Sequence, residues 1–137
     1  MADGEDFNTT NIAEFRANHG RVGGQFDGAP LLILHTVGAK SGQPRTNIMM
    51  YLADGDRYLI FASNGGADTH PAWYHNVTAH PEVHIELGDE EFDAVATELE
   101  GAERDAKYAE QVRRYPGFGE YQEQTDRTIP VIAVTPV

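Results

Sequence analysis

Alternating apolar and polar residues predict a small antiparallel sheet with helices in its connections. An unbroken apolar run at 31–36 is typical of a buried strand. Five further segments have the composition or alternation of strands, at 46–53, 57–63, 83–87, 92–99 and 128–135. Asp54-Gly55 between two of them predicts a tight hairpin, because such a turn favours positive φ. Five or six short strands of this kind indicate a closed or nearly closed barrel.

Helical spacing of apolar residues predicts four helices. Ile12 and Phe15 indicate one over 8–18, and four glycines between positions 20 and 28 favour a flexible connection after it. We therefore expect 1–30 to form an N-terminal helix and connection, and 31–137 to form a single domain. The other helices are expected over 70–79, with Thr69 as N-cap, over 103–115, and in a short segment ending at Gln124.

Composition excludes several classes of protein. The 137 residues suit one domain with its own core, and the absence of cysteine excludes disulfides and Cys-based zinc sites. No apolar run approaches the roughly 20 residues of a membrane helix, and the acidic N-terminus is unlike a secretory signal. The formal net charge of −12 argues against a nucleic-acid partner. We expect a soluble, cytoplasmic protein, either a monomer or a weak dimer.

Charge is distributed unevenly along the chain. The segment 82–110 carries eleven carboxylates, whereas Lys40 and Arg45 are the only charged residues between Asp27 and Asp54. These two cations flank a turn that contains glycine, serine and proline. Such a loop can direct backbone N–H groups, a hydroxyl and two positive side chains at one anion, although two ordinary surface cations would have the same pattern. Neither a Walker loop nor a GxGxxG fingerprint is present.

A second polar loop, Ala62-Ser63-Asn64-Gly65-Gly66, follows another predicted strand. Its adjacent glycines would allow a ligand to approach the backbone closely. The helix after it carries Trp73, Tyr74 and Asn76, although the two aromatic residues suit a core position equally well. His70, His75 and His80 are spaced five apart, so a helix would not gather them on one face, and we expect no metal site.

Four strings together resemble the deazaflavin-dependent nitroreductase family of actinobacteria, the A branch of the flavin/deazaflavin oxidoreductases. They are LLILHTVGAKSGQPRTN, LADGDRYLIFASNGG, HPAWYHNVTAHPEV and YPGFGEYQEQTDRTIPVI. The resemblance runs from about Leu31 to the C-terminus in the same motif order. It implies an α+β, mainly β fold, a split β-barrel (FMN-binding-like) with flanking helices, which binds coenzyme F420.

The resemblance also implies site residues, position by position. The loop from Lys40 to Arg45 would bind the phosphate and acidic tail of the coenzyme. The coenzyme contacts would be Lys40, Ser41, Arg45, Thr46, Asn47, Ile48, Met49, Met50, Ala62, Ser63, Asn64, Trp73, Tyr74 and Asn76. The substrate pocket would be lined by Ser63, Tyr115, Phe118 and Tyr121.

The expected activity is hydride transfer from reduced F420 to a small planar acceptor: a nitroaromatic, a quinone or a conjugated enone. Because the coenzyme performs this chemistry, the chain needs no nucleophile–base pair. Ser63 is the candidate that stabilises developing negative charge, and Tyr115, Tyr121 or solvent would supply a proton. Two alternatives stay open, namely an FMN-dependent oxidoreductase of the same barrel type and a non-catalytic F420-binding or storage protein. Ala39 and Asn64 stand where known members carry cations, which leaves the affinity for a long polyglutamate tail open.

Overall fold

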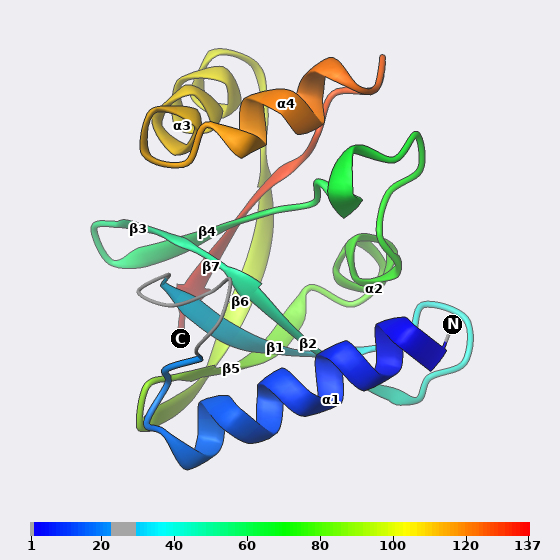
Figure 1. Cartoon of the computed structure of the whole chain (residues 1–137), viewed down its shortest axis with the longest axis vertical. Coiled ribbons are helices and arrows are strands. Elements are labelled where there is room, and N and C mark those ends of the chain that lie inside the picture. Colours follow the sequence, from blue (N-terminus) through cyan, green and yellow to red (C-terminus); the bar gives the residue numbers. More distant parts are fainter. Residues whose placement is uncertain (1, 23–29) are drawn as a thin grey trace.

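The computed structural model describes residues 2–22 and 30–137, with side chains for 9–22 and 30–137 (Figure 1). The strands are β1 Leu31–Val37, β2 Pro44–Met50, β3 Leu52–Asp54, β4 Arg57–Phe61, β5 Glu82–Leu87, β6 Glu90–Leu99 and β7 Val131–Pro136. The helices are α1 Ala2–Ala17, α2 Ala72–Ala79, α3 Gly101–Arg114 and α4 Gly117–Glu123, with a 3₁₀ turn η2 at Asn64–Gly66. Figure 1 shows α1 alongside β1 and β2, and α3 and α4 together at the opposite end of the molecule.

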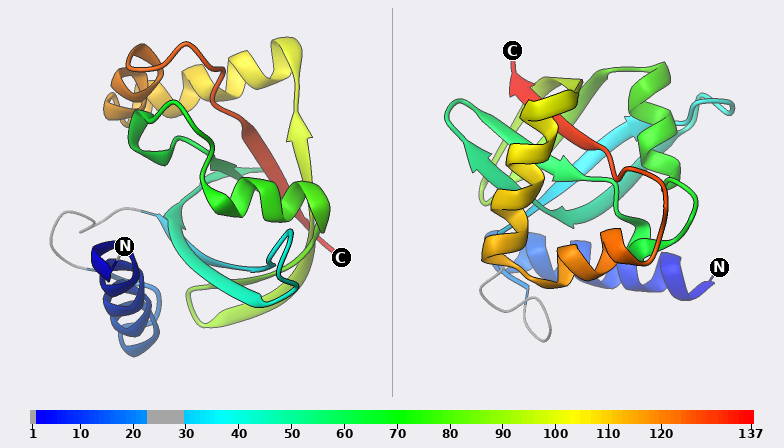
Figure 2. Two further views of the ribbon diagram at one scale, coloured as in Figure 1. Left: turned by 90° about the vertical axis from the view of Figure 1, so that its right-hand side faces the viewer. Right: turned by 90° about the horizontal axis from the view of Figure 1, so that it is seen from above.

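The seven strands form one antiparallel sheet in the order β2-β1-β5-β6-β7-β4-β3. Its two edge strands, β2 and β3, are consecutive in the chain, with only Tyr51 between them. Two edges can be joined by one residue only if the sheet curls until they approach each other. The sheet therefore has the shape of a barrel that is open along one seam (Figure 2).

The predicted single strand over 46–53 is wrong for the same reason. Its first part pairs with β1, where Leu31 faces Met50, and its second part pairs with β4, where Leu52 faces Leu59. Alternation along the sequence continues through the bend and does not reveal it. The hairpin prediction is confirmed, since Gly55 has a φ of 62° between β3 and β4.

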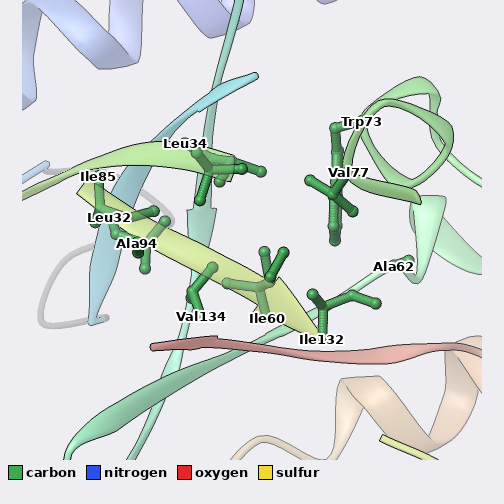
Figure 3. Packing of buried hydrophobic residues seen from close by; sticks show 12 residues of the cluster. Leu32, Leu34, Ile60, Ala62, Trp73, Val77, Ile85, Ala94, Ile132 and Val134 are labelled. Atoms are coloured by element: carbon green, nitrogen blue, oxygen red, sulfur yellow. The ribbon is translucent and has the colours of Figure 1, made fainter. Parts of the chain in front are cut away.

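β1 is buried on both faces, which explains its unbroken apolar run. Leu32 and Leu34 point into the barrel, toward Ile60 and Ile132 and toward Trp73 of α2 (Figure 3). Leu31 and Ile33 point outward and pack against α1 through two residues, Ile12 and Phe15. α1 thus takes the place of a second layer over this part of the sheet.

Several boundaries differ from the predictions. α1 begins at Ala2 and not at position 8, because the hydrophobic pattern marks only the part of the helix that packs on the sheet. The predicted N-cap Thr69 is wrong, since Pro71 occupies that position and no side chain caps the helix. The expected flexible connection lies mostly at 23–29, outside the described residues. No helix in the described part of the chain is long and apolar enough to span a membrane.

Candidate functional site

A groove of about 1180 Å³ lies between α1, α2 and the connection from β1 to β2. The connection and the start of β2 supply Gly38, Ala39, Lys40, Ser41, Pro44, Arg45, Thr46 and Asn47. α1 supplies Thr9, Ile12, Ala13 and Arg16, and α2 supplies Ala72, His75 and Asn76. Six of the residues that the resemblance implied for coenzyme binding therefore lie along one groove: Lys40, Ser41, Arg45, Thr46, Asn47 and Asn76.

The charge of this groove is opposite to that of the whole chain. Three cationic side chains, Lys40, Arg45 and Arg16, are among its lining residues, and none of the lining residues is Asp or Glu. The chain as a whole has 22 acidic residues against 10 Lys and Arg. Within the described residues neither Lys40 nor Arg45 forms an ion pair, and both are exposed. Such a site suits an anionic ligand.

Three of the six backbone N–H groups in the loop over 38–43 donate to acceptors within the loop. Gly38 N donates to Gln43 O at 2.8 Å, Gly42 N donates to Gly38 O at 3.0 Å, and Gln43 N donates to the Ser41 hydroxyl at 3.1 Å. A Cβ on Gly38 would lie 2.4 Å from that hydroxyl, so a larger residue there would force the Ser41 side chain to move. These three N–H groups are engaged within the loop, whereas the side chains of Lys40, Ser41 and Arg45 line the groove.

Asn76 on α2 forms hydrogen bonds with the loop over 38–43 and with the end of β1. It is buried, its Oδ1 accepts a hydrogen bond from Ala39 N at 2.9 Å, and its Nδ2 donates to Thr36 Oγ1 at 3.2 Å. Both bonds join α2 to the end of β1 and the residues after it. The side chain that was predicted to contact coenzyme thus also holds the loop that carries Lys40.

The second predicted loop, over 62–66, is held by a residue that sequence reasoning missed. The guanidinium of Arg127 donates to three backbone carbonyls, Ala62 O at 3.2 Å, Ser63 O at 2.8 Å and Ala67 O at 2.8 Å. It also donates to His70 Nδ1 at 3.0 Å. Burial, together with the charge of Arg127, lowers the pKa of His70, which favours the neutral ring that this bond requires.

This loop contacts the helix that carries the predicted substrate residues. A Cβ on Gly66 would lie 2.7 Å from Gln124 Oε1 and 3.2 Å from Tyr121 Cα, and Gly66 has a φ of 85°. Phe118 and Tyr121 on α4 pack together at 5.4 Å between ring centroids, against the cluster that contains Phe61. The fold therefore brings the Ser63 loop to the Phe118–Tyr121 surface.

The other predicted site residues lie outside the groove lining. Met49 packs against the barrel interior, whereas Ile48 and Met50 point to the opposite face, toward α1. Ala62 and Trp73 belong to the buried core, as the core interpretation of Trp73 expects. The predicted residues Ser63, Tyr74 and Tyr115 are half-buried and Asn64 is exposed, and the Tyr74 hydroxyl donates to Glu98 at 2.7 Å.

Tyr51 is a further residue that the sequence did not single out. Its ring meets that of Tyr58 edge to face at 5.5 Å. Burial raises the pKa of Tyr51, and the nearby Tyr58 and Tyr115 hydroxyls raise it further. A tyrosine at the bend between two strands gives no spacing signal, so only the fold shows that it lies near Tyr115. Among the described residues no cluster of His, Asp and Glu suits a metal ion.

A curled antiparallel sheet that is open along one seam, with a cationic groove beside its edge strand β2, defines a small split-barrel protein. The fold is that of the split β-barrels. A putative pyridoxamine 5'-phosphate oxidase from Listeria innocua shares it at 15% identity and a TM-score of 0.56, over 78% of this chain and 83% of that chain.

Within this class, residues 8–136 match the family model described as F420H(2)-dependent quinone reductase, and the chain belongs to that family. An F420H(2)-dependent quinone reductase of Mycobacterium tuberculosis is 41% identical over 127 residues, which cover 90% of this chain and 85% of that protein. A solved F420-H2 dependent reductase (FDR-A) is 43% identical with a TM-score of 0.70, over 77% of this chain and 93% of that chain. The cofactor of the family is reduced coenzyme F420.

Proposed function

We propose that the chain is an F420-dependent reductase that delivers a hydride to a quinone-type acceptor, with the anionic arm of the coenzyme held beside Lys40 and Arg45. The observation that carries the placement of the coenzyme is the charge of the groove, which has three cations and no carboxylate in its lining. In a chain of net charge −12, such a surface is expected where a ligand carries the complementary charge.

The residues along the groove fit this coenzyme chemically. Arg45 can grip two oxygens of a phosphate at once, while Lys40 acts as a point charge. The Ser41 hydroxyl accepts a bond from Gln43 N, which leaves its own proton available to an anion. Asn76 keeps the loop in place without adding charge.

When bound, reduced F420 supplies the hydride, so the chain has to orient the acceptor and exclude competing reactions. Ser63 is our candidate donor to the acceptor oxygen, where negative charge develops during reduction. Its loop is fixed by Arg127 and packs against α4, which carries Phe118 and Tyr121. These two aromatic side chains, together with Tyr115, form our proposed wall for a planar acceptor.

A binding titration followed by an acceptor screen tests the proposal. Oxidised F420 is expected to bind more tightly than FMN, and reduced F420 is expected to be oxidised only when an acceptor such as a quinone is added. The same screen tests nitroaromatics and conjugated enones as further acceptors. Tighter binding of FMN would overturn the choice of coenzyme. Binding of F420 without acceptor-dependent oxidation would identify a storage or carrier protein.

A further inference from the structure

A single phosphate bound beside Lys40 and Arg45 would not account for the part of the groove that α1 lines. A volume of about 1180 Å³ exceeds the roughly 300–1,000 Å³ that is typical of small-ligand pockets. Lys40 and Arg45 lie on one side, within a single turn and the strand after it. Arg16 lines the same groove from α1, which is separated from Lys40 and Arg45 in the chain by β1. The cationic surface therefore extends onto a second element.

Contacts with the sheet fix the position of Arg16. Ile12 and Phe15 are buried against β1, and after the helix His19 Nδ1 lies 2.6 Å from Asp89 Oδ1. A Cβ on Gly20 would come within 2.7 Å of Gly88 Cα, so the chain passes close to the β5–β6 turn. α1 is thus held at both its apolar face and its C-terminal end.

The guanidinium of Arg16 retains capacity for a ligand. Its Nε and Nη2 donate to the two oxygens of Glu86, at 2.9 and 2.5 Å. Nη1 has no hydrogen bond to any described residue, and the Arg16 side chain is 52% exposed. Glu86, at 15% exposure, is not among the lining residues of the groove. Arg16 therefore has one partner, Glu86, outside the groove lining, and one amino group, Nη1, without a bond to the described residues.

We infer that Arg16 binds the carboxylates of the coenzyme's glutamate tail and makes the protein prefer coenzyme that carries this tail. The inference rests on the proposed placement of the phosphate beside Lys40 and Arg45. An anionic tail that leaves this pair along the groove meets Arg16 as the next cation in the lining. Arg16 also supplies positive charge in a groove where Ala39 contributes none.

The test compares coenzyme without glutamate residues and coenzyme with several, titrated against each variant. Arg16→Gln is expected to raise the Kd of the tailed form about 3- to 10-fold and to leave that of the tail-free form within about twofold. Arg45→Gln is expected to weaken both forms. Arg21→Gln is the matched control, because Arg21 is an exposed arginine near the end of α1 that does not line the groove, and it should change neither Kd.

A second variant distinguishes a role of Arg16 in binding the coenzyme from a role in holding α1 on the sheet. Glu86→Gln breaks the same ion pair but keeps the charge of Arg16, so the affinity for the tailed form should be retained or increased. If Glu86→Gln weakens that form as much as Arg16→Gln does, Arg16 acts by docking α1 and the inference is wrong. Equal effects of Arg16→Gln on both forms, or no effect on either, would also overturn it. If the wild-type protein binds neither form, or Arg45→Gln changes nothing, the proposed function itself fails.

Discussion

Arg45 is one of the three cationic residues that line the groove. It is exposed, and within the described residues its side chain donates one long hydrogen bond of 3.4 Å, to the carbonyl of Pro44. Because the guanidinium has no carboxylate partner among the described residues, a phosphate would not have to displace one. Charge-assisted hydrogen bonds of this kind contribute about 1.5–3 kcal/mol each.

Arg45→Ala is therefore expected to raise the Kd for F420 by about one to two orders of magnitude, which corresponds to the loss of one such contact. Fluorescence titration of the oxidised coenzyme measures the change. Arg21→Ala serves as the control for net charge and should leave the Kd unaltered. An unchanged Kd in Arg45→Ala would remove Arg45 from the phosphate site.

Gln111 is a buried residue whose amide has no partner. It is 0% exposed, and neither Nε2 nor Oε1 forms a hydrogen bond with the described residues. Leaving such a group unpaired costs about 1–3 kcal/mol. Gln111→Met is therefore expected to raise the free energy of unfolding by about 1–2 kcal/mol, measured by urea denaturation.

Gln122 provides the matched contrast for Gln111. Its Nε2 donates to Arg127 O at 2.7 Å, and its Oε1 accepts bonds from Arg104 Nη2 at 2.8 Å and Ile129 N at 3.0 Å. Gln122→Met should lower the free energy of unfolding, because these groups lose their partner. A loss of stability in Gln111→Met as well would show that the buried amide has a partner, such as an internal water.

At the scale of elements, the loop over 38–43 depends on α2, through a residue that follows the loop by more than thirty positions. Asn76 on α2 accepts the N–H of Ala39 and donates to Thr36, so two bonds from one amide set the position of the loop. The opposite wall is set by α1, through its contacts with β1. The groove is therefore a product of how α1 and α2 dock on the barrel (Figure 2).

Asn76→Ala is expected to release the loop without unfolding the sheet. Hydrogen exchange at the amide of Ala39 should accelerate, while the amide of Gly42, which bonds to Gly38 O inside the loop, should stay protected. The Kd for F420 should rise several-fold, about 1 kcal/mol, because Lys40 loses its fixed position. If protection at Ala39 persists, Asn76 does not hold the loop in solution.

At the scale of the whole molecule, ion pairs between distant elements make stability depend on pH. Hydrogen bonds from Arg16, with a smaller contribution from His35, lower the pKa of Glu86 from 4.5 to about 2. Its ionised form therefore stabilises the fold above about pH 4.5, and this contribution is lost as the pH falls toward 2.

At the alkaline side, hydrogen bonds to Asp93 and Glu91 raise the pKa of His84 above 6.5. The protonated His84 stabilises the fold below pH 6.5, and this contribution is lost as the pH rises through the folded-state value.

These two opposing windows place the greatest stability at about pH 5–6.5. Urea denaturation between pH 3 and 9, in steps of about one unit, checks this expectation. Glu86→Gln should flatten the acid limb in part, since Asp54 and Glu110 also have lowered pKa values. His84→Gln should flatten the alkaline limb. If the free energy of unfolding of His84→Gln falls with rising pH as steeply as that of the wild type, another group causes the loss of stability at alkaline pH.

The sequence by itself determined the features that depend on neighbouring residues. The strands other than the predicted one over 46–53, the positive φ at Gly55 and the cationic turn from Lys40 to Arg45 are local, because alternation, turn geometry and charge spacing act within a few residues. The four motifs, although separate in the chain, were specific enough together to indicate the family.

Only the tertiary structure decided which segments share the groove. Arg16 belongs to a helix whose apolar pattern says that it packs, but not on which strands. Arg127 contacts a loop about sixty residues before it, and the bend at Tyr51 follows from closure of the barrel. These placements result from burying apolar faces in three dimensions, an energy that is summed over the whole molecule and has no counterpart in the spacing of residues along the chain.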